Sequence, residues 1–195
     1  MDLRICVVGD ELTAGAGDSK ALGWAGRVAA RTPDRPHTYV LAVPGETTTE
    51  LSNRWESETT RRFHGAPEGS ARLVIGLGRH DVRAGLSVAR SRLNLANMLD
   101  TAQARHLPVF VVGPPPGLEA DNERIGELSR AFADVAHRRR VPFVDTFTPL
   151  VTHEQWHADL ATTGDDLPGQ AGYGLMAWLV LHTEWHAWLG VDAPA

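Results

Sequence analysis

The sequence is poor in several features that define whole classes of protein. It has one cysteine, Cys6, inside an apolar segment, which excludes a disulfide framework. No apolar run approaches the roughly 20 residues that a membrane-spanning helix needs. The residues before the first apolar segment lack the basic stretch and the cleavage site of a secretory signal peptide. We therefore expect a cytoplasmic protein without a membrane partner.

Lysine is nearly absent as well. Lys20 is the lone lysine among 19 basic residues, and the formal net charge is −5. Nucleic-acid binding needs clustered Lys or Arg side chains that face the phosphates. The one basic run, at residues 138–140, ends a predicted helix, where cations interact favourably with the helix dipole. We therefore expect no nucleic-acid partner.

Short apolar segments alternate with longer amphipathic ones along the chain. We predict strands at residues 3–8, 38–42, 72–75, 109–112 and 142–144, and helices at 22–31, 47–63, 87–106, 119–139 and 170–189. Such alternation is typical of βαβ units, and strands rich in Val, Leu and Ile on both faces are typical of a buried parallel sheet. The expectation is one α/β domain over residues 1–195, with five parallel strands between two helix layers.

The first strand ends in a Gly-Asp turn whose tip is Glu11. At the carboxyl end of a strand in an open α/β sheet, backbone N–H groups converge and ligands bind. Gly- and Pro-rich segments at 43–45, 76–78 and 113–117 follow later strands and would open on the same side. Glu11 is therefore expected to face a substrate pocket. A helix N-terminus would lower the pKa of Glu11 and burial would raise it, so the direction of the shift stays open.

Four stretches of the sequence carry a resemblance to a known family. They are residues 8–15 (Val-Gly-Asp-Glu-Leu-Thr-Ala-Gly), 43–51 (Val-Pro-Gly-Glu-Thr-Thr-Thr-Glu-Leu), 76–81 (Gly-Leu-Gly-Arg-His-Asp) and 164–173 (Gly-Asp-Asp-Leu-Pro-Gly-Gln-Ala-Gly-Tyr). In this order the four resemble the sequence blocks of the SGNH/GDSL hydrolase family. The resemblance spans nearly the whole chain and implies a flavodoxin-like, three-layer α/β/α sandwich, the SGNH hydrolase fold.

Three catalytic positions of that family hold other residues here. The nucleophilic serine position holds Glu11, the oxyanion asparagine position holds His80, and the final histidine is missing, with residues 167–168 at its place. Serine ester hydrolysis needs a hydroxyl nucleophile and a histidine base within reach of it. An ionised Glu11 would repel a developing oxyanion, and its carboxylate could itself occupy the oxyanion hole.

These replacements leave three functions open. The favoured one is a small-molecule enzyme in which Glu11 and His80 perform general acid/base chemistry: proton abstraction, elimination or intramolecular cyclisation. The second is ester hydrolysis by a relocated mechanism, with Glu11 as nucleophile or base, or with Thr13 or Thr47 as a weaker hydroxyl candidate. The third is an inactive binding or scaffold protein. The first is favoured because Glu and His both move protons, whereas drift gives apolar replacements as readily.

The predicted site follows from the resemblance. Its catalytic candidates are Glu11, His80, Asp165 and Asp166, and its substrate- or oxyanion-binding candidates are Asp10, Gly45, Gly78 and Asp81. No cofactor is expected, and no feature of the sequence specifies the substrate or an oligomeric state. Arg79 and Arg83 are read as exposed side chains, with contact to an anionic substrate group as the alternative.

A His-Glu-x-x-His pattern at residues 153–157 offers a rival chemistry. On a helix, His153 and His157 would share one face and could bind zinc, as in zinc proteases. The surrounding βαβ organisation is not that of a zinc protease. We therefore keep this metal site only as a weak alternative.

Overall fold

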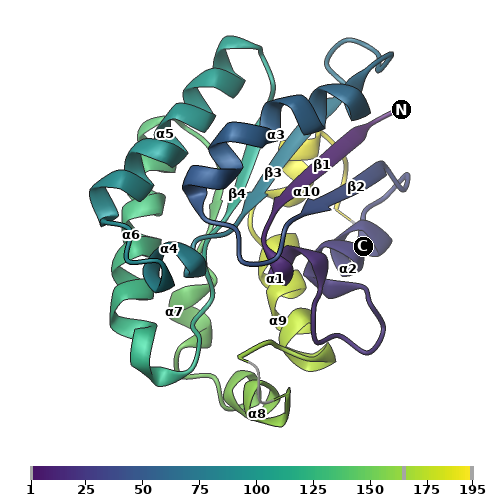
Figure 1. Cartoon of the computed structure of the whole chain (residues 1–195). Helices are drawn as coiled ribbons and strands as arrows, with labels where there is room; N and C mark the ends of the chain where they lie inside the picture. Colours follow the sequence, from purple (N-terminus) through teal and green to yellow (C-terminus); the bar gives the residue numbers. More distant parts are fainter. Residues whose placement is uncertain (1, 164–165, 194–195) are drawn as a thin grey trace.

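Five parallel strands form one sheet in the computed structural model, which describes residues 2–163 and 166–193. The strands are β1 (Arg4–Gly9), β2 (His37–Ala42), β3 (Ala71–Gly76), β4 (Val109–Val112) and β5 (Phe143–Val144). Their order is β2-β1-β3-β4-β5, and every neighbouring pair is parallel (Figure 1). The predicted five-stranded parallel sheet is confirmed.

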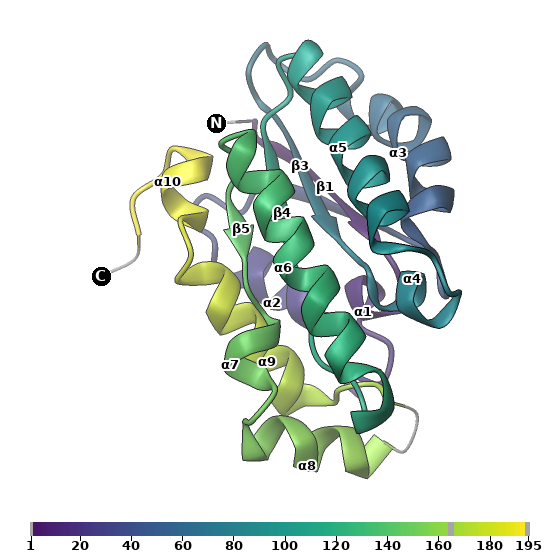
Figure 2. The ribbon, with the colours of Figure 1, turned by 90° about the vertical axis from the view of Figure 1, so that its left-hand side faces the viewer.

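Helices cover both faces of this sheet because alternate strand residues point to opposite sides. Ile5 and Val7 of β1 belong to a buried cluster with α2 (Gly23–Arg31) and α9 (Gln170–Leu181). Cys6 and Val8 belong to a second cluster, whose helices are α3 (Thr48–Phe63), α5 (Val88–Ala104) and α6 (Asn122–Arg138). Figures 1 and 2 show the resulting three layers, as predicted.

Short helices gather at the carboxyl end of the sheet. α1 (Glu11–Ala14) and α4 (Arg79–Arg83) begin directly after β1 and β3, and α8 (Glu154–Thr163) lies at the bottom of Figure 1. The remaining short helical elements are η1 (Glu119–Asp121), α7 (Phe147–Leu150) and, toward the opposite end of the sheet in Figure 2, α10 (Trp185–Leu189). No helix in the described part of the chain has the length and apolar character needed to cross a membrane.

The last predicted helix, 170–189, is wrong as a continuous element. It breaks between α9 and α10, where Glu184 adopts a left-handed backbone conformation with φ 48°. The break directs Trp185 into the core, where its ring meets Phe110 edge-on at 5.2 Å and its indole N–H donates to Thr32 Oγ1 at 3.0 Å. Neither glycine nor proline occurs at this turn. The apolar periodicity therefore continues across residues 182–184, and the sequence does not indicate that the helix breaks there.

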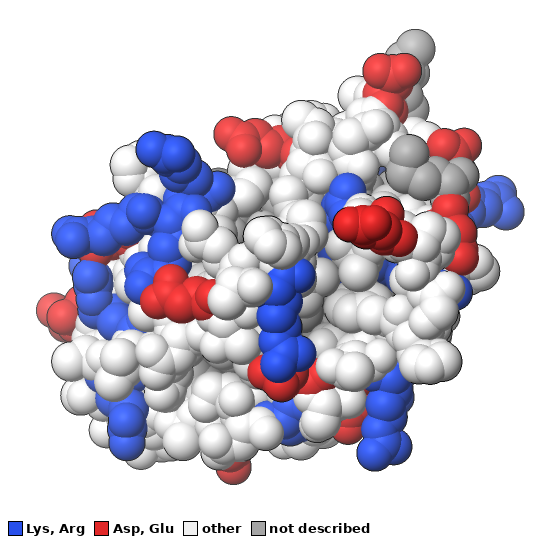
Figure 3. Space-filling view, turned by 90° about the horizontal axis from the view of Figure 1, so that it is seen from above, with Lys and Arg blue, Asp and Glu red and all other residues white. Residues whose placement is uncertain are grey.

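Charged side chains of both signs are mixed on the face seen in Figure 3. Arg and Lys side chains gather toward its left, and Asp and Glu side chains lie among them. The ion pairs of the described residues include Arg139 with Asp100 at 2.7 Å and Arg138 with Asp134 at 2.9 Å. Part of the basic run at 138–140 is therefore neutralised locally.

Candidate active site

The turn between β1 and α1 places Glu11 at the carboxyl end of the sheet. A Cβ at Gly9 would lie 2.0 Å from the carbonyl oxygen of Gly76, so only glycine allows the two strands to approach this closely. Asp10 caps α1, because its Oδ1 accepts from the backbone N–H of Leu12 at 3.0 Å. Glu11 is then the first residue of the helix.

The Glu11 carboxylate joins three segments that are far apart in the sequence. Its Oε1 lies 2.6 Å from His80 Nε2, at the start of α4. Its Oε2 accepts from the backbone N–H of Gly45, in the loop after β2, at 2.8 Å. The side chains of Glu11 and His80 are 15% and 16% exposed. The structure thus brings together Glu11, His80 and Gly45, which the resemblance assigned to one pocket.

These contacts decide the protonation state that the sequence left open. Burial alone would raise the pKa of Glu11, but the hydrogen bonds from His80 and Gly45 outweigh it and lower this pKa to about 2. The hydrogen bond to Glu11 in turn raises the pKa of His80. The contact therefore favours a carboxylate on Glu11 and an imidazolium on His80.

The position of this carboxylate has a chemical consequence. By the resemblance, the Gly45 N–H and the side chain at position 80 form the oxyanion hole, and Glu11 accepts hydrogen bonds from both. An oxyanion hole acts when its donors face the oxygen that gains charge in the transition state. In this arrangement a substrate oxygen reaches the two donors only if the Glu11 carboxylate moves aside.

Asp10 lies fully buried beside this pair. Its Oδ2 has no hydrogen-bond partner among the described residues, and burial followed by the Glu11 charge raises its pKa to about 7. A cavity of about 10 Å³, enough for one water molecule, lies against Asp10, Gly78 and Arg79. Gly78 precedes α4 with φ 139°, and a Cβ there would meet the Phe132 ring at 2.9 Å. Asp10 and Gly78 therefore line the floor of the site.

Asp81 lies behind the site. It is 1% exposed, and its two oxygens accept from the backbone N–H and the hydroxyl of Thr48, each at 2.7 Å. Asn94 donates to the same hydroxyl at 2.9 Å. Asp81 thus fixes the start of α3 and the adjoining Gly45 loop. Asn94 was not among the predicted site residues; the one indication of it is a polar residue next to Leu95 on the apolar face of an amphipathic helix.

Asp166, an acidic residue of the fourth sequence block, has partners other than His80. Asp166 contacts the guanidinium groups of Arg79 and Arg83, and its Oδ1 accepts from the backbone N–H of Leu118 at 2.7 Å. In the part of the chain that is described, its carboxylate makes no hydrogen bond to His80. Asp165, the other candidate, lies outside the described residues.

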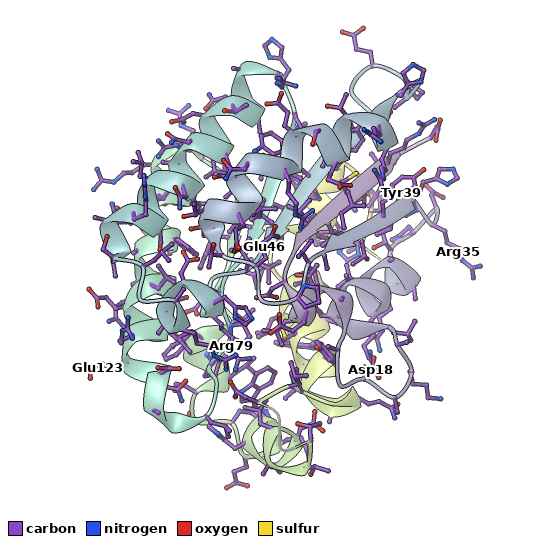
Figure 4. All side chains as sticks on the ribbon, in the orientation of Figure 1. Asp18, Arg35, Tyr39, Glu46, Arg79 and Glu123 are labelled. Atoms are coloured by element: carbon purple, nitrogen blue, oxygen red, sulfur yellow. The ribbon has the colours of Figure 1, made fainter. Side chains whose placement is uncertain are left out.

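Arg79 differs from its expected exposure. It is 2% exposed, and Figure 4 shows it at the carboxyl end of the sheet, well below Glu46. Burial lowers its pKa to about 10, and the neighbouring Arg83 acts in the same direction. Exposure was expected because arginine is rarely buried without a partner. Here the Asp166 carboxylate supplies that partner.

The hydroxyls of the two threonine candidates form hydrogen bonds that stabilise the local backbone structure. Thr13 is 1% exposed and its hydroxyl donates to the carbonyl oxygen of Gly76 at 2.7 Å. Thr47 caps α3 through a reciprocal capping box with Glu50, to whose Oε2 its hydroxyl donates at 2.7 Å. Among the described residues neither hydroxyl is hydrogen-bonded to a histidine base.

The predicted metal ligands His153 and His157 lie at the start of α8. His153 directly precedes the helix, and the Nε2 of His157 lies 2.8 Å from the carbonyl oxygen of Val151; neither histidine belongs to a group of three or more possible ligands among the described residues. Asp10, Glu11 and His80 do converge, with ligand atoms within 4.8 Å of one another. Binding a cation there would require His80 Nε2 to be unprotonated.

Comparisons with known proteins agree with the fold and the motif order. A family model described as the GDSL-like Lipase/Acylhydrolase family matches residues 7–175. Esterase TesA of Pseudomonas aeruginosa is 27% identical over 146 residues, which cover 73% of this chain and 70% of that protein.

Solved structures extend the likeness to almost the whole chain. The lipase/acylhydrolase from Enterococcus faecalis superposes with a TM-score of 0.76 at 21% identity, over 99% of each chain. Axe2, an acetylxylan esterase from Geobacillus stearothermophilus, superposes with a TM-score of 0.74 at 18% identity, over 99% of this chain and 96% of that one. These structures share the fold. Because the family model covers most of its residues, the chain belongs to the GDSL-like lipase/acylhydrolase family, as its sequence blocks predicted.

Proposed function

We propose that the chain is an enzyme that acts on a small molecule by general acid/base chemistry through Glu11 and His80, in place of the family's serine mechanism. The observation that carries this proposal is the 2.6 Å contact between Glu11 Oε1 and His80 Nε2. The lowered pKa of Glu11 keeps its carboxylate ionised, as a proton acceptor must be, and the raised pKa of His80 favours the protonated imidazolium, which is the form that donates a proton.

The pair has the parts of a complete proton cycle. The Glu11 carboxylate takes a proton from the substrate, and the His80 imidazolium gives one to a developing oxyanion or leaving oxygen. In an elimination, the C–H electron pair becomes the new double bond while the C–O bond breaks. Glu11 then returns its proton to His80 through their direct hydrogen bond. The same steps serve proton abstraction and intramolecular cyclisation.

Substrate binding would strengthen Glu11 as a base. A substrate oxygen that takes the Gly45 N–H removes one of the hydrogen bonds that lower the pKa of Glu11. Burial, the opposing influence, then gains weight and the pKa rises. The carboxylate is thus held inactive at rest and becomes more basic when a substrate is present.

Ester hydrolysis with Glu11 as general base is the second candidate. Two groups that the resemblance assigns to the oxyanion hole favour it: the Gly45 N–H and the His80 side chain both contact one group, the Glu11 carboxylate. The relatives described as esterases act on esters, which points the same way. Here Glu11 would take a proton from water, the water oxygen would bond to the carbonyl carbon, and His80 would protonate the departing alcohol.

The test is turnover by the purified protein, with p-nitrophenyl acetate as ester probe and a panel of small hydroxy acids for elimination or cyclisation. Glu11→Gln should lower any turnover by about 100-fold or more, the usual contribution of a general base. Glu56→Gln is the matched control, because Glu56 pairs with Arg105 on the surface and is 45% exposed. This control should keep the wild-type rate.

Each result separates the functions. Glu11-dependent hydrolysis of p-nitrophenyl acetate would move the second candidate to first place. A folded Glu11→Gln protein with full turnover would reject a catalytic role for Glu11. No turnover in any assay by the folded wild type would instead favour the inactive binding or scaffold protein.

A further inference from the structure

We infer that Arg79, Arg83 and the Leu118 N–H form a carboxylate-binding subsite that the protein's own Asp166 occupies at rest, and that the substrate is a small carboxylic acid. The inference rests on the proposed function and names its substrate class. Three donors converge on the Asp166 carboxylate: Oδ2 contacts both guanidinium groups and Oδ1 accepts from Leu118 N–H at 2.7 Å.

The subsite is built into the fold. The Arg79 side chain is 3% exposed, whereas that of Arg83 is 38% exposed and reachable from solvent. A buried guanidinium without an anion would be costly, because burial disfavours an unpaired charge. Two arginines that face one carboxylate leave more positive charge at this position than a single ion pair needs. That excess favours an anion from solution.

Gly117 leaves the space for the anion. A Cβ at this position would lie 2.6 Å from Arg79 Nη2 and 2.8 Å from Asp166 Oδ2. A side chain here would therefore fill the space between Arg79, Arg83 and the Leu118 N–H, which we call the cradle. The loop that carries Gly117 is fixed by Asn122, whose Oδ1 accepts from the Gly117 N–H at 2.8 Å and whose Nδ2 donates to its carbonyl at 3.1 Å. The cradle is therefore held open by its own loop.

Its place beside the acid/base pair gives the subsite a role. Arg79 and His80 are consecutive residues of α4, and the Glu11 charge is close enough to raise the pKa of Arg79. A substrate carboxylate bound to Arg79 would hold a neighbouring atom of the same molecule near Glu11 and His80. The Glu11 carboxylate accepts hydrogen bonds from Gly45 and His80, just as the Asp166 carboxylate accepts those of the cradle. Two internal carboxylates thus stand where two substrate oxygen groups would bind.

The shape of the donors selects a carboxylate. The Asp166 group that fits them is planar, with one oxygen on the arginines and the other on a backbone N–H. Arginine pairs well with both carboxylates and phosphates, so the two must be compared directly. An internal carboxylate also competes as if present at millimolar concentration or above, so wild-type affinity for a free acid should be weak.

The experiment measures binding of acetate, succinate, inorganic phosphate and neutral acetamide by NMR titration at constant ionic strength. Asp166→Asn removes the negative charge from the cradle and Asp166→Gly empties it, and both residues tolerate the left-handed backbone at this position, where φ is 57°. Both variants should bind acetate and succinate about tenfold more tightly than wild type. Adding Arg83→Gln to Asp166→Asn should remove most of that gain, and acetamide should not bind.

The controls separate a subsite from a structural ion pair. Asp134→Asn removes a carboxylate that also contacts two arginines, Arg92 and Arg138, but lies on the surface, and it should bind acetate like wild type. Unchanged acetate affinity in both folded Asp166 variants would overturn the inference. Phosphate binding as tight as succinate binding would overturn the carboxylate assignment.

Two further measurements keep the inference testable in other cases. If the Asp166 variants fail to fold, succinate should still raise the melting temperature of wild type more than that of Arg83→Gln, and equal shifts would overturn the inference. Glu11→Gln should lose turnover but still bind succinate, at least as tightly as its parent, because it removes a negative charge near Arg79. A loss of activity without a loss of this binding separates failure of the acid/base proposal from failure of the subsite.

Discussion

His80 Nε2 lies 2.6 Å from Glu11 Oε1, so the residues at the serine and asparagine positions of this family form a direct acid–base contact in this chain. The contact makes stability depend on pH in both directions. The pKa of Glu11 is lowered from 4.5 to about 2, so its contribution is present above pH 4.5 and is lost as pH falls toward 2. The pKa of His80 is raised from 6.5, so its contribution is present below pH 6.5 and is lost as pH rises through the folded value.

Glu11→Gln should therefore destabilise the protein most between pH 4.5 and 6.5, by about 2 kcal/mol, as for a hydrogen bond between charged groups. Urea unfolding at pH 3, 5.5 and 9 measures the difference from wild type, which should shrink at both extremes. Glu56→Gln should show a small difference with no maximum at pH 5.5. A Glu11→Gln difference that is the same at all three pH values would contradict the ion pair.

The stability of the Asp10→Asn variant relative to wild type should increase as pH rises. The pKa of Asp10 is raised from 3.8 to about 7, so between these values the folded protein holds a proton that the unfolded chain has released, and wild-type stability falls with rising pH. Asn caps a helix as well as Asp does but does not titrate. Relative to wild type, the variant should gain about 2–4 kcal/mol between pH 4 and pH 7.5.

Asp145→Asn is the matched control for this measurement. Asp145 also accepts from a helical backbone N–H, that of Phe147 at 3.0 Å, but it is exposed. Chemical denaturation at the two pH values compares the variants. A gain by Asp10→Asn no larger than that of the control would show that burial does not hold the proton on Asp10.

Thr13→Val should lower the free energy of unfolding by about 1–3 kcal/mol, because it leaves the Gly76 carbonyl oxygen buried without its donor. Thr13→Ser keeps the hydroxyl and should lose less. Because we assign Thr13 no chemical step, Thr13→Val should keep any turnover of the wild type within about threefold. A folded Thr13→Val protein without turnover, beside an active Thr13→Ser protein, would revive Thr13 as the nucleophile.

Asp81→Ala should cost about 3 kcal/mol, because it removes both acceptors of Thr48 in a buried position. It should also loosen the start of α3, so the Gly45 amide should exchange its hydrogen faster than in wild type. Asp81→Asn keeps one acceptor, so its free energy of unfolding and its Gly45 exchange rate should lie between those of wild type and Asp81→Ala. Unchanged exchange at Gly45 in Asp81→Ala would show that Asp81 does not position that loop.

The sequence predicted the fold and the meeting of Glu11, Gly45 and His80 for one physical reason. The carboxyl ends of neighbouring parallel strands lie at one edge, so the residues that follow β1, β2 and β3 must approach one another. Which oxygen of Glu11 meets which donor depends on the backbone of short loops, and no pattern in the sequence encodes it.

Long-range pairing of charges was the least predictable part of the site. Arg79 and Asp166 are separated by 87 residues, and nothing local to either one indicates the other. Burial of Arg79 follows from its close approach to Gly117 and its contact with Asp166, whereas arginine taken alone favours exposure. Asn94 likewise gains its role only when α5 packs beside α3.

A glutamate in the oxyanion hole also decides which reagents can detect this protein. Fluorophosphonate reagents label serine hydrolases by phosphonylating a nucleophilic serine, and the position that the resemblance aligns with that serine carries a carboxylate that accepts hydrogen bonds at both oxygens. We therefore expect such reagents to leave this position unlabelled. Its activity has to be found through what it binds.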